Sequence, residues 1–104
     1  MPYIKKDDRL KVDAEIDALV DAILKQFEEK SGVLNYAITR LLTSVLSLDV
    51  ATRYANLNCA AGVLECVKLE LYRRIAAKYE DTKVHENGDV LEYKQFEDKI
   101  NNRV

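Results

Sequence analysis

The chain has 104 residues, of which 48% are hydrophobic and 33% are charged, and its net charge at neutral pH is −2. These proportions fit one domain with its own core and exclude a disordered linker. Three glycines and one proline are too few for a β-sandwich with many turns, so we expect an all-α fold. The longest uncharged run is too short to cross a bilayer, and the charged N-terminus lacks the apolar region of a signal peptide, which predicts a cytoplasmic protein.

The first predicted helix covers residues 13–30. Asp13 is a suitable N-terminal cap, and Gly32 supplies a stop soon after Lys30. Its apolar residues recur at the three- and four-residue spacing of an amphipathic helix. They are Ile16, Leu19, Val20, Ile23, Leu24 and Phe27.

The second predicted helix covers residues 34–48 and has the same periodicity. Its apolar positions are Leu34, Ile38, Leu41, Leu42, Val45 and Leu46. The opposite face has a single charge, which is unusual for a helix face bathed in water. Its residues are Tyr36, Arg40, Thr43 and Ser47, and we expect them to meet a partner, a ligand or the chain's own tail.

The third predicted helix is the longest and covers residues 52–79. One apolar stripe should pack on the first two helices and so complete a small three-helix bundle within a single domain, residues 1–104. The stripe contains Leu57, Ala60, Ala61, Leu64, Val67, Leu71, Tyr72, Ile75 and Tyr79.

A second seam on the third helix alternates steps of four and three, as coiled-coil interfaces do. Its members are Ala55, Cys59, Gly62, Cys66 and Leu69, and Arg73 continues it. The first four are small and allow two backbones to approach closely, either the chain's own helices or the same seam of another subunit. We expect a homo-oligomer. Both cysteines should be reduced, because their spacing on one helix is too long for a disulfide. No other cysteine pair or nearby histidine completes a zinc site, so we expect them to be buried as small hydrophobic residues.

Residues 80–104 are predicted to form a turn and a short helical tail. Asn87-Gly88 favours a turn with positive φ, as a short hairpin or an irregular turn. Leu91, Tyr93, Phe96 and Ile100 indicate a last helix. Next to the turn, the chain's single histidine, His85, lies near Asp81, Glu86 and Asp89, but this spacing fits neither the zinc nor the calcium motif. We therefore interpret this stretch as a solvated turn, and expect no metal site and no cofactor.

The middle of the chain is basic, since residues 32–79 carry six basic and three acidic side chains, a net charge of +3. Arginines beside tyrosines can clamp phosphates and stack on bases, which predicts an anion site. Its candidate residues are Arg40, Lys68, Arg73, Arg74, Tyr36, Tyr72 and Tyr79. The alternative is structural: cations near a helix C-terminus stabilise that end, and Glu65 can pair with Lys68.

The chain has no nucleophile elbow, phosphate-binding glycine loop, dinucleotide fingerprint or paired ExxE carboxylates, so an enzyme is disfavoured and no catalytic residue is assigned. Four blocks, "MPYIKKDDR", "LNYAITRLL", "GVLECVKLELYRR" and "YEDTKVHENGDV", together resemble a family of short bacterial and bacteriophage proteins known as a domain of unknown function. The resemblance extends to about Val90 and implies a phage or bacterial cytoplasmic setting without supplying any site residue.

Two functions follow as hypotheses. The first is a non-enzymatic binding protein that sequesters an anionic small molecule; by analogy with small phage proteins, this is a nucleotide immune signal. The alternative is a protein-interaction module that docks a helix of a host or phage protein on the face around Arg40. A metal or acid–base enzyme using His85, Asp81 and Glu65 is a remote third, and neither a membrane nor nucleic acid is an expected partner.

Overall fold

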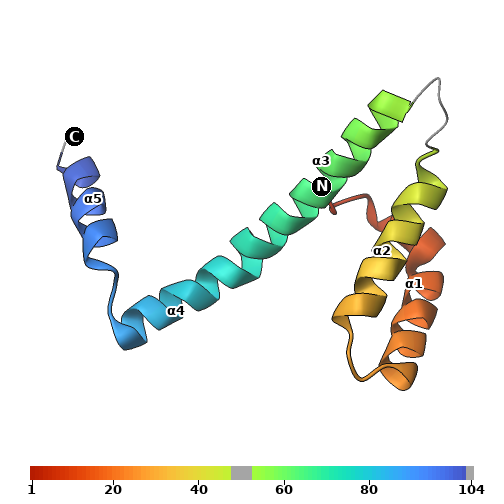
Figure 1. Ribbon diagram of the computed structural model, residues 1–104, viewed down its shortest axis with the longest axis horizontal. Helices are drawn as coiled ribbons and strands as arrows, with labels where there is room; N and C mark the ends of the chain where they lie inside the picture. The colour runs from red at the N-terminus through yellow and green to blue at the C-terminus, as the bar shows by residue number, and fades with distance from the viewer. Residues whose placement is uncertain (48–52, 103–104) are drawn as a thin grey trace. The chain divides into compact units, whose positions relative to one another are not determined.

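The computed structural model describes residues 1–47 and 53–102, and all the regular structure in these ranges is helical (Figure 1). The prediction of an all-α fold is confirmed. The chain divides into two compact units, Met1–Val67 and Lys68–Val104. None of the helices in the described ranges is both long enough and apolar enough to cross a membrane.

The first unit begins with a helical hairpin. Helix α1 is Lys6–Gln26 and helix α2 is Ser31–Val45, and the two run antiparallel, side by side, on either side of a short loop (Figure 1). Helix α1 starts seven residues earlier than predicted, so Asp13 lies inside the helix and caps nothing. The first turn instead contains Asp7 and Asp8, whose negative charges favour a helix N-terminus.

Helix α2 begins at a carboxylate cap that the sequence pattern did not reveal. Glu29 accepts hydrogen bonds from the backbone N–H of Ser31 at 2.8 Å and from the Ser31 hydroxyl at 2.6 Å. These bonds to Ser31 lower the pKa of the Glu29 carboxyl below its ordinary value. Gly32 therefore lies in the first turn of α2, which corrects the prediction that it stops the first helix; α1 ends at Gln26, before an extended Phe27.

Helix α3, Arg53–Leu71, follows α2 in the first unit and continues into the second. The amide of Asn56 donates a hydrogen bond to the carbonyl of Ser47, which ties the beginning of α3 to the end of α2. The predicted ends of helix two at Leu48 and of helix three at Thr52 lie outside the described residues.

The second unit contains a π-helical turn, η1 (Tyr72–Ala76), then helix α4 (Ala77–Asn87) and helix α5 (Leu91–Asn101). In η1 the N–H of Ala77 bonds to the carbonyl of Tyr72, five residues back. A π-turn holds one residue more than an α-turn, so the residues after it lie about 100° from their place on an unbroken α-helix. On an unbroken α-helix Tyr79 would lie about 80° from Leu71, and the extra residue reduces this to about 20°, so Tyr79 stays on the side of the stripe predicted for the third helix.

The helix that follows η1 also runs past the predicted end at Tyr79, to Asn87. His85 lies in its last turn, and Lys83 to Glu86 are helical, so the hairpin alternative is wrong. Gly88 ends the helix with φ +87°, which confirms the predicted positive φ at the Asn-Gly pair. The predicted tail helix is present as α5.

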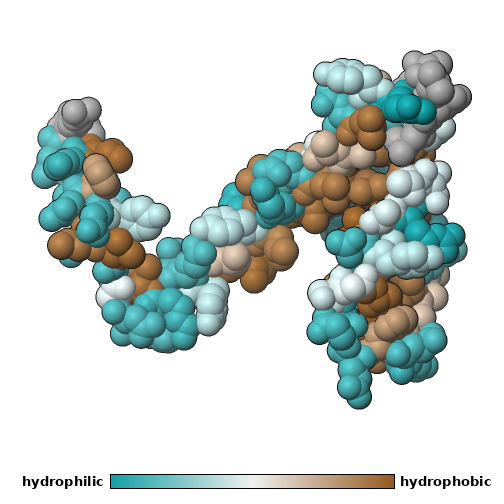
Figure 2. Space-filling view, viewed as in Figure 1, coloured by the Kyte–Doolittle hydropathy of each residue, from teal (hydrophilic) through white to brown (hydrophobic). Residues whose placement is uncertain are grey.

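The described residues form no buried core. No side chain among them is buried, and large apolar side chains reach the surface along the helices of both units (Figure 2). The sequence from Tyr54 to Val67 has a single charge, Glu65, which predicts a half-helix covered on nearly every side. The chain's own helices do not provide this cover: Tyr54 is 82% exposed, and Cys59 and Cys66, which were predicted to be buried, are free and exposed. A three-helix bundle needs a shared core, so it stays a prediction.

Candidate functional site

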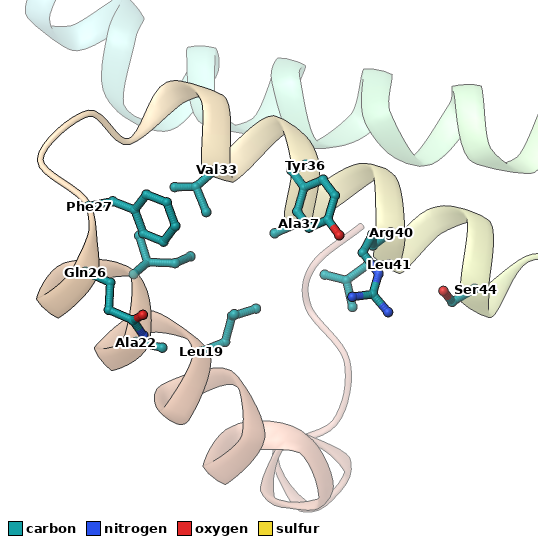
Figure 3. A pocket seen from close by; sticks show the side chains of 11 residues that line it. Leu19, Ala22, Gln26, Phe27, Val33, Tyr36, Ala37, Arg40, Leu41 and Ser44 are labelled. Carbon is teal, nitrogen blue, oxygen red and sulfur yellow. The ribbon is translucent and has the colours of Figure 1, made fainter.

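An apolar groove of about 430 Å³ lies between α1 and α2 in the first unit (Figure 3). The α1 side is formed by Leu19, Ala22, Ile23 and Gln26, and Phe27 closes the end at the loop. Val33, Tyr36, Ala37, Arg40, Leu41 and Ser44 of α2 complete the lining. Side chains from both helices point towards one another across the groove, so it is built from the facing sides of one hairpin.

The groove combines an apolar floor with one charged side chain among the described residues that line it. The guanidinium carbon of Arg40 lies 5.9 Å from the centroid of the Tyr36 ring, a cation–π distance that holds the two side chains together at the rim. Cavities of this kind, apolar with a few polar groups that fix orientation, are typical of binding sites. Leu41 is 56% exposed, so an occupant gains contact area that the hairpin alone does not use.

The predicted interaction face on the second helix coincides in part with the groove, and its role in binding stays a prediction. Tyr36 and Arg40 do line the groove, whereas Thr43 and Ser47 do not. The Thr43 hydroxyl donates to the carbonyl of Thr39 at 2.8 Å, as threonine does inside helices. The apolar periodicity of the second helix predicted that Leu41 lies in a bundle core. The periodicity of one helix does not show whether the side that faces another helix is filled or open.

A second candidate site lies around the π-turn. Arg73 pairs with Glu70, with 2.7 Å between the guanidinium and carboxylate atoms, and the Tyr72 hydroxyl donates to Glu80 at 2.6 Å. The hydrogen bond to Glu80, together with that group's negative charge, raises the pKa of Tyr72 above its ordinary value. These carboxylates offset the basic charge on which the predicted anion site depends.

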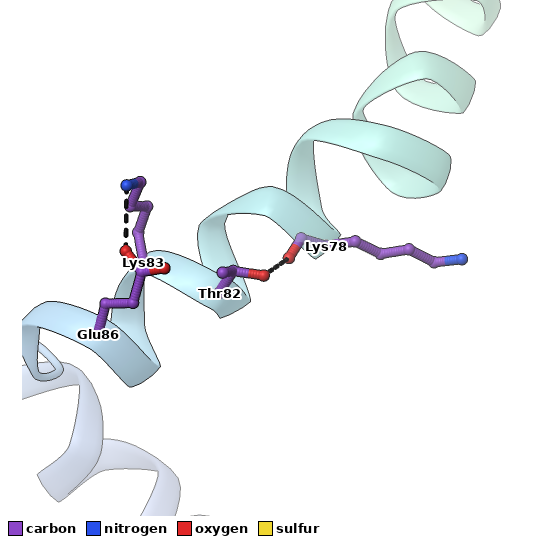
Figure 4. Close-up of polar contacts among 4 residues, drawn as sticks. All are labelled: Lys78, Thr82, Lys83 and Glu86. Carbon is purple, nitrogen blue, oxygen red and sulfur yellow. Dashed lines mark hydrogen bonds and ion pairs between the residues drawn. The ribbon is translucent and has the colours of Figure 1, made fainter.

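The C-terminal side of this cluster lies on α4 (Figure 4). The Lys83 ammonium lies 3.1 Å from a Glu86 carboxylate oxygen and 5.5 Å from the centroid of the Tyr79 ring. The Thr82 hydroxyl donates to the Lys78 carbonyl at 3.2 Å, and the Lys78 side chain extends away from the helix. Tyr79 therefore already has a cation beside it, from its own helix.

The predicted anion-site residues divide between the two units. Tyr36 and Arg40 belong to the first unit; the second contains Lys68, Tyr72, Arg73, Arg74 and Tyr79. The structure brings Tyr36 and Arg40 together, and it places Tyr72, Arg73 and Arg74 on one π-turn. A single anion site built from all seven residues stays a prediction.

The small seam on α3 is open in the first unit. A methyl group added at Gly62 has no atom within 4 Å, and Ala55, Cys59, Cys66 and Leu69 are exposed. The close approach predicted there is not made by the chain's own helices, and association through another subunit stays a prediction. Over residues 1–47 and 53–102, no three histidine, cysteine or acidic side chains gather in a way that could hold a metal ion.

The model of one family, a domain of unknown function (DUF6899), matches residues 1–90. The chain belongs to this family. The match includes the α1–α2 hairpin and the helical run up to Gly88, and it ends at the residue before α5. No curated protein and no solved structure matches the chain.

Proposed function

We propose that this member of the family acts by binding, as a protein-interaction module whose α1–α2 groove receives an amphipathic helix. The observation that supports the proposal is the open apolar groove with Arg40 at its rim, on a hairpin that buries no described side chain. A helix laid in a groove presents apolar anchors three, four and seven residues apart, and the two facing helices offer matching apolar floor.

Arg40 gives the groove a charge preference. An occupant with a carboxylate beside its apolar stripe pairs with the guanidinium, whereas one with a lysine there repels it. Pairs of this kind at a solvated rim contribute about 0.2 to 1 kcal/mol each, so the charge sets orientation and selectivity more than affinity. The apolar floor provides most of the binding energy.

The proposal is tested with two synthetic helices that have the same apolar positions and opposite net charge, each labelled for fluorescence anisotropy. We expect the acidic helix to bind more tightly, and Leu41→Glu to weaken binding at least 10-fold, since burying the exposed half of a leucine contributes about 1 to 1.5 kcal/mol and a buried unpaired carboxylate costs more. Leu10→Glu is the matched control, because Leu10 is 73% exposed and does not line the groove. Equal losses in both variants, or binding unaffected by Leu41→Glu, would rule out the groove.

A second proposed function is the binding of an anionic small molecule at the π-turn. Turns of this type occur frequently at functional sites, and here the turn carries both Arg73 and Arg74. Calorimetry with cyclic dinucleotides and NAD-derived nucleotides tests it, with Arg73→Ala as the variant. Lys11→Ala is the control, because it also removes an exposed i,i+3 ion pair. A nucleotide that binds wild type and Lys11→Ala but not Arg73→Ala supports the site, and no heat with any nucleotide counts against it.

A further inference from the structure

Helix α5 has an apolar face that nothing in the described part of its own unit covers. Tyr93, Phe96 and Ile100 lie within one arc of about 60° on the helix, at 67%, 61% and 68% exposure. Spacings of three and four residues are those with which a helix enters a groove. The proposed groove needs an amphipathic helix, and the chain itself supplies one.

The lengths of the helix and the groove agree. Helix α5 has 11 residues, which corresponds to about 16 Å at 1.5 Å per residue. The α2 wall of the groove extends from Val33 to Ser44, also about 16 Å. The apolar face itself, from Tyr93 to Ile100, covers about 10 Å, so it fits within the floor.

The charges at the two rims also agree with those of α5. Arg40 lines the groove on the α2 side. Glu15 is not a lining residue, but the helical repeat sets it one turn before Leu19 and on the same side of α1 as Ala22, next to the α1 rim. Because the two helices are antiparallel, both rise from the same loop. At 1.5 Å per residue, Arg40 lies about 13 Å along α2 from Ser31, and Glu15 lies about 16 Å along α1 from Gln26. The rims thus offer one cation and one anion, about 3 Å apart along the groove.

Helix α5 carries the opposite charges in the matching order. Glu97 and Lys99 are two residues and about 3 Å apart, on opposite flanks of the apolar face. The Lys99 ammonium lies 5.7 Å from the centroid of the Phe96 ring, at the edge of that face. Suppose that α5 lies in the groove parallel to α2. Because the α-helix is right-handed, Glu97 then faces Arg40 on the α2 rim, and Lys99 faces Glu15 beside the α1 rim. If α5 lies in the opposite direction, Glu97 faces Glu15 and the two like charges repel.

We propose that the groove of one chain receives α5 of a second copy, parallel to α2, with Glu97 at Arg40 and Lys99 at Glu15. This inference rests on the proposed docking function and names its occupant. The donor in this proposal is a second copy, and the mixing experiment below distinguishes it from the chain's own α5.

Complementation between two full-length variants separates exchange between copies from contact within one. Leu41→Glu disables the groove and keeps α5, while Phe96→Glu disables α5 and keeps the groove. We expect wild type to dimerise in sedimentation velocity, each variant alone to associate at least 10-fold more weakly, and an equimolar mixture to form a heterodimer through its one intact contact. A monomeric wild type, or a mixture no stronger than its components, overturns the inference.

Charge reversal keeps the test informative if the apolar variants lose helicity. Arg40→Glu and Glu97→Arg are each expected to weaken self-association about 3- to 10-fold, and the double variant should recover most of that loss. Failure of the double variant to recover overturns the pairing. Binding of the synthetic acidic helix distinguishes the docking function of the groove from the identity of its occupant. If the Phe96→Glu protein still dimerises while the Leu41→Glu protein no longer binds the synthetic helix, the groove binds helices but α5 is not its occupant.

Discussion

Replacing Gly62 by alanine tests whether the small seam on α3 is open. Inside a helix, alanine is favoured over glycine by about 1 kcal/mol, chiefly because glycine loses more backbone entropy on folding. A Cβ at this position meets no atom within 4 Å, so no steric cost offsets the gain. We therefore expect Gly62→Ala to raise the free energy of unfolding by about 0.5 to 1 kcal/mol.

Urea unfolding followed by circular dichroism at 222 nm measures this gain. With a denaturant slope of about 1 to 3 kcal/mol per molar for a small protein, the midpoint should move up by about 0.2 to 1 M. Ala61→Gly is the matched control on the neighbouring exposed position, and its midpoint should fall by a similar amount. Repeating the series at several protein concentrations separates helix stability from association.

A destabilised Gly62→Ala protein whose midpoint also loses its concentration dependence would refute the reasoning. That outcome requires another backbone close to Gly62 in the assembled protein, because only a near neighbour makes an added methyl group costly. It would restore the close-packed seam predicted from Ala55, Cys59, Gly62 and Cys66. The sign of the change in the free energy of unfolding therefore shows whether the seam is open or closely packed in the assembled protein.

Two further predictions concern the second unit. Spectrophotometric titration should show one of the six tyrosines ionising above the ordinary pKa, and Glu80→Gln should lower that pKa because the carboxylate no longer accepts a hydrogen bond from Tyr72. The stability from this bond is present below the ordinary tyrosine pKa and is lost as the pH rises through the raised pKa. A titration without a shifted tyrosine would contradict the Tyr72–Glu80 contact. Gly88→Ala should destabilise the end of α4 by about 1 kcal/mol or more, since φ +87° strains any residue with a Cβ. Faster hydrogen exchange in the last turn of α4 would report it, and unchanged exchange would argue against a positive-φ cap at Gly88.

Where the sequence was sufficient, the signal was local. The periodicity of apolar residues predicted helices in the right regions, including α5, because one helix imposes its own 3.6-residue repeat on the side chains. The positive φ at Gly88 was also predictable, since an Asn-Gly pair has the least steric cost there. Helix ends were less accurate: the Glu29 cap of α2 depends on the rotamer of one carboxylate, and neither spacing nor composition reports it.

The candidate site depended on the tertiary structure. The sequence singled out Tyr36 and Arg40 because their face has one charge, but it assigned Leu41 to a closed core and so missed the groove they share. Its single stripe on the third helix assumed an unbroken α-helix, and the spacing of the apolar residues did not reveal the π-turn at Tyr72–Ala76. Periodicity determines which residues share one side of a helix. Whether that side is covered depends on the distance to other helices, and a repeat within one segment does not encode that distance.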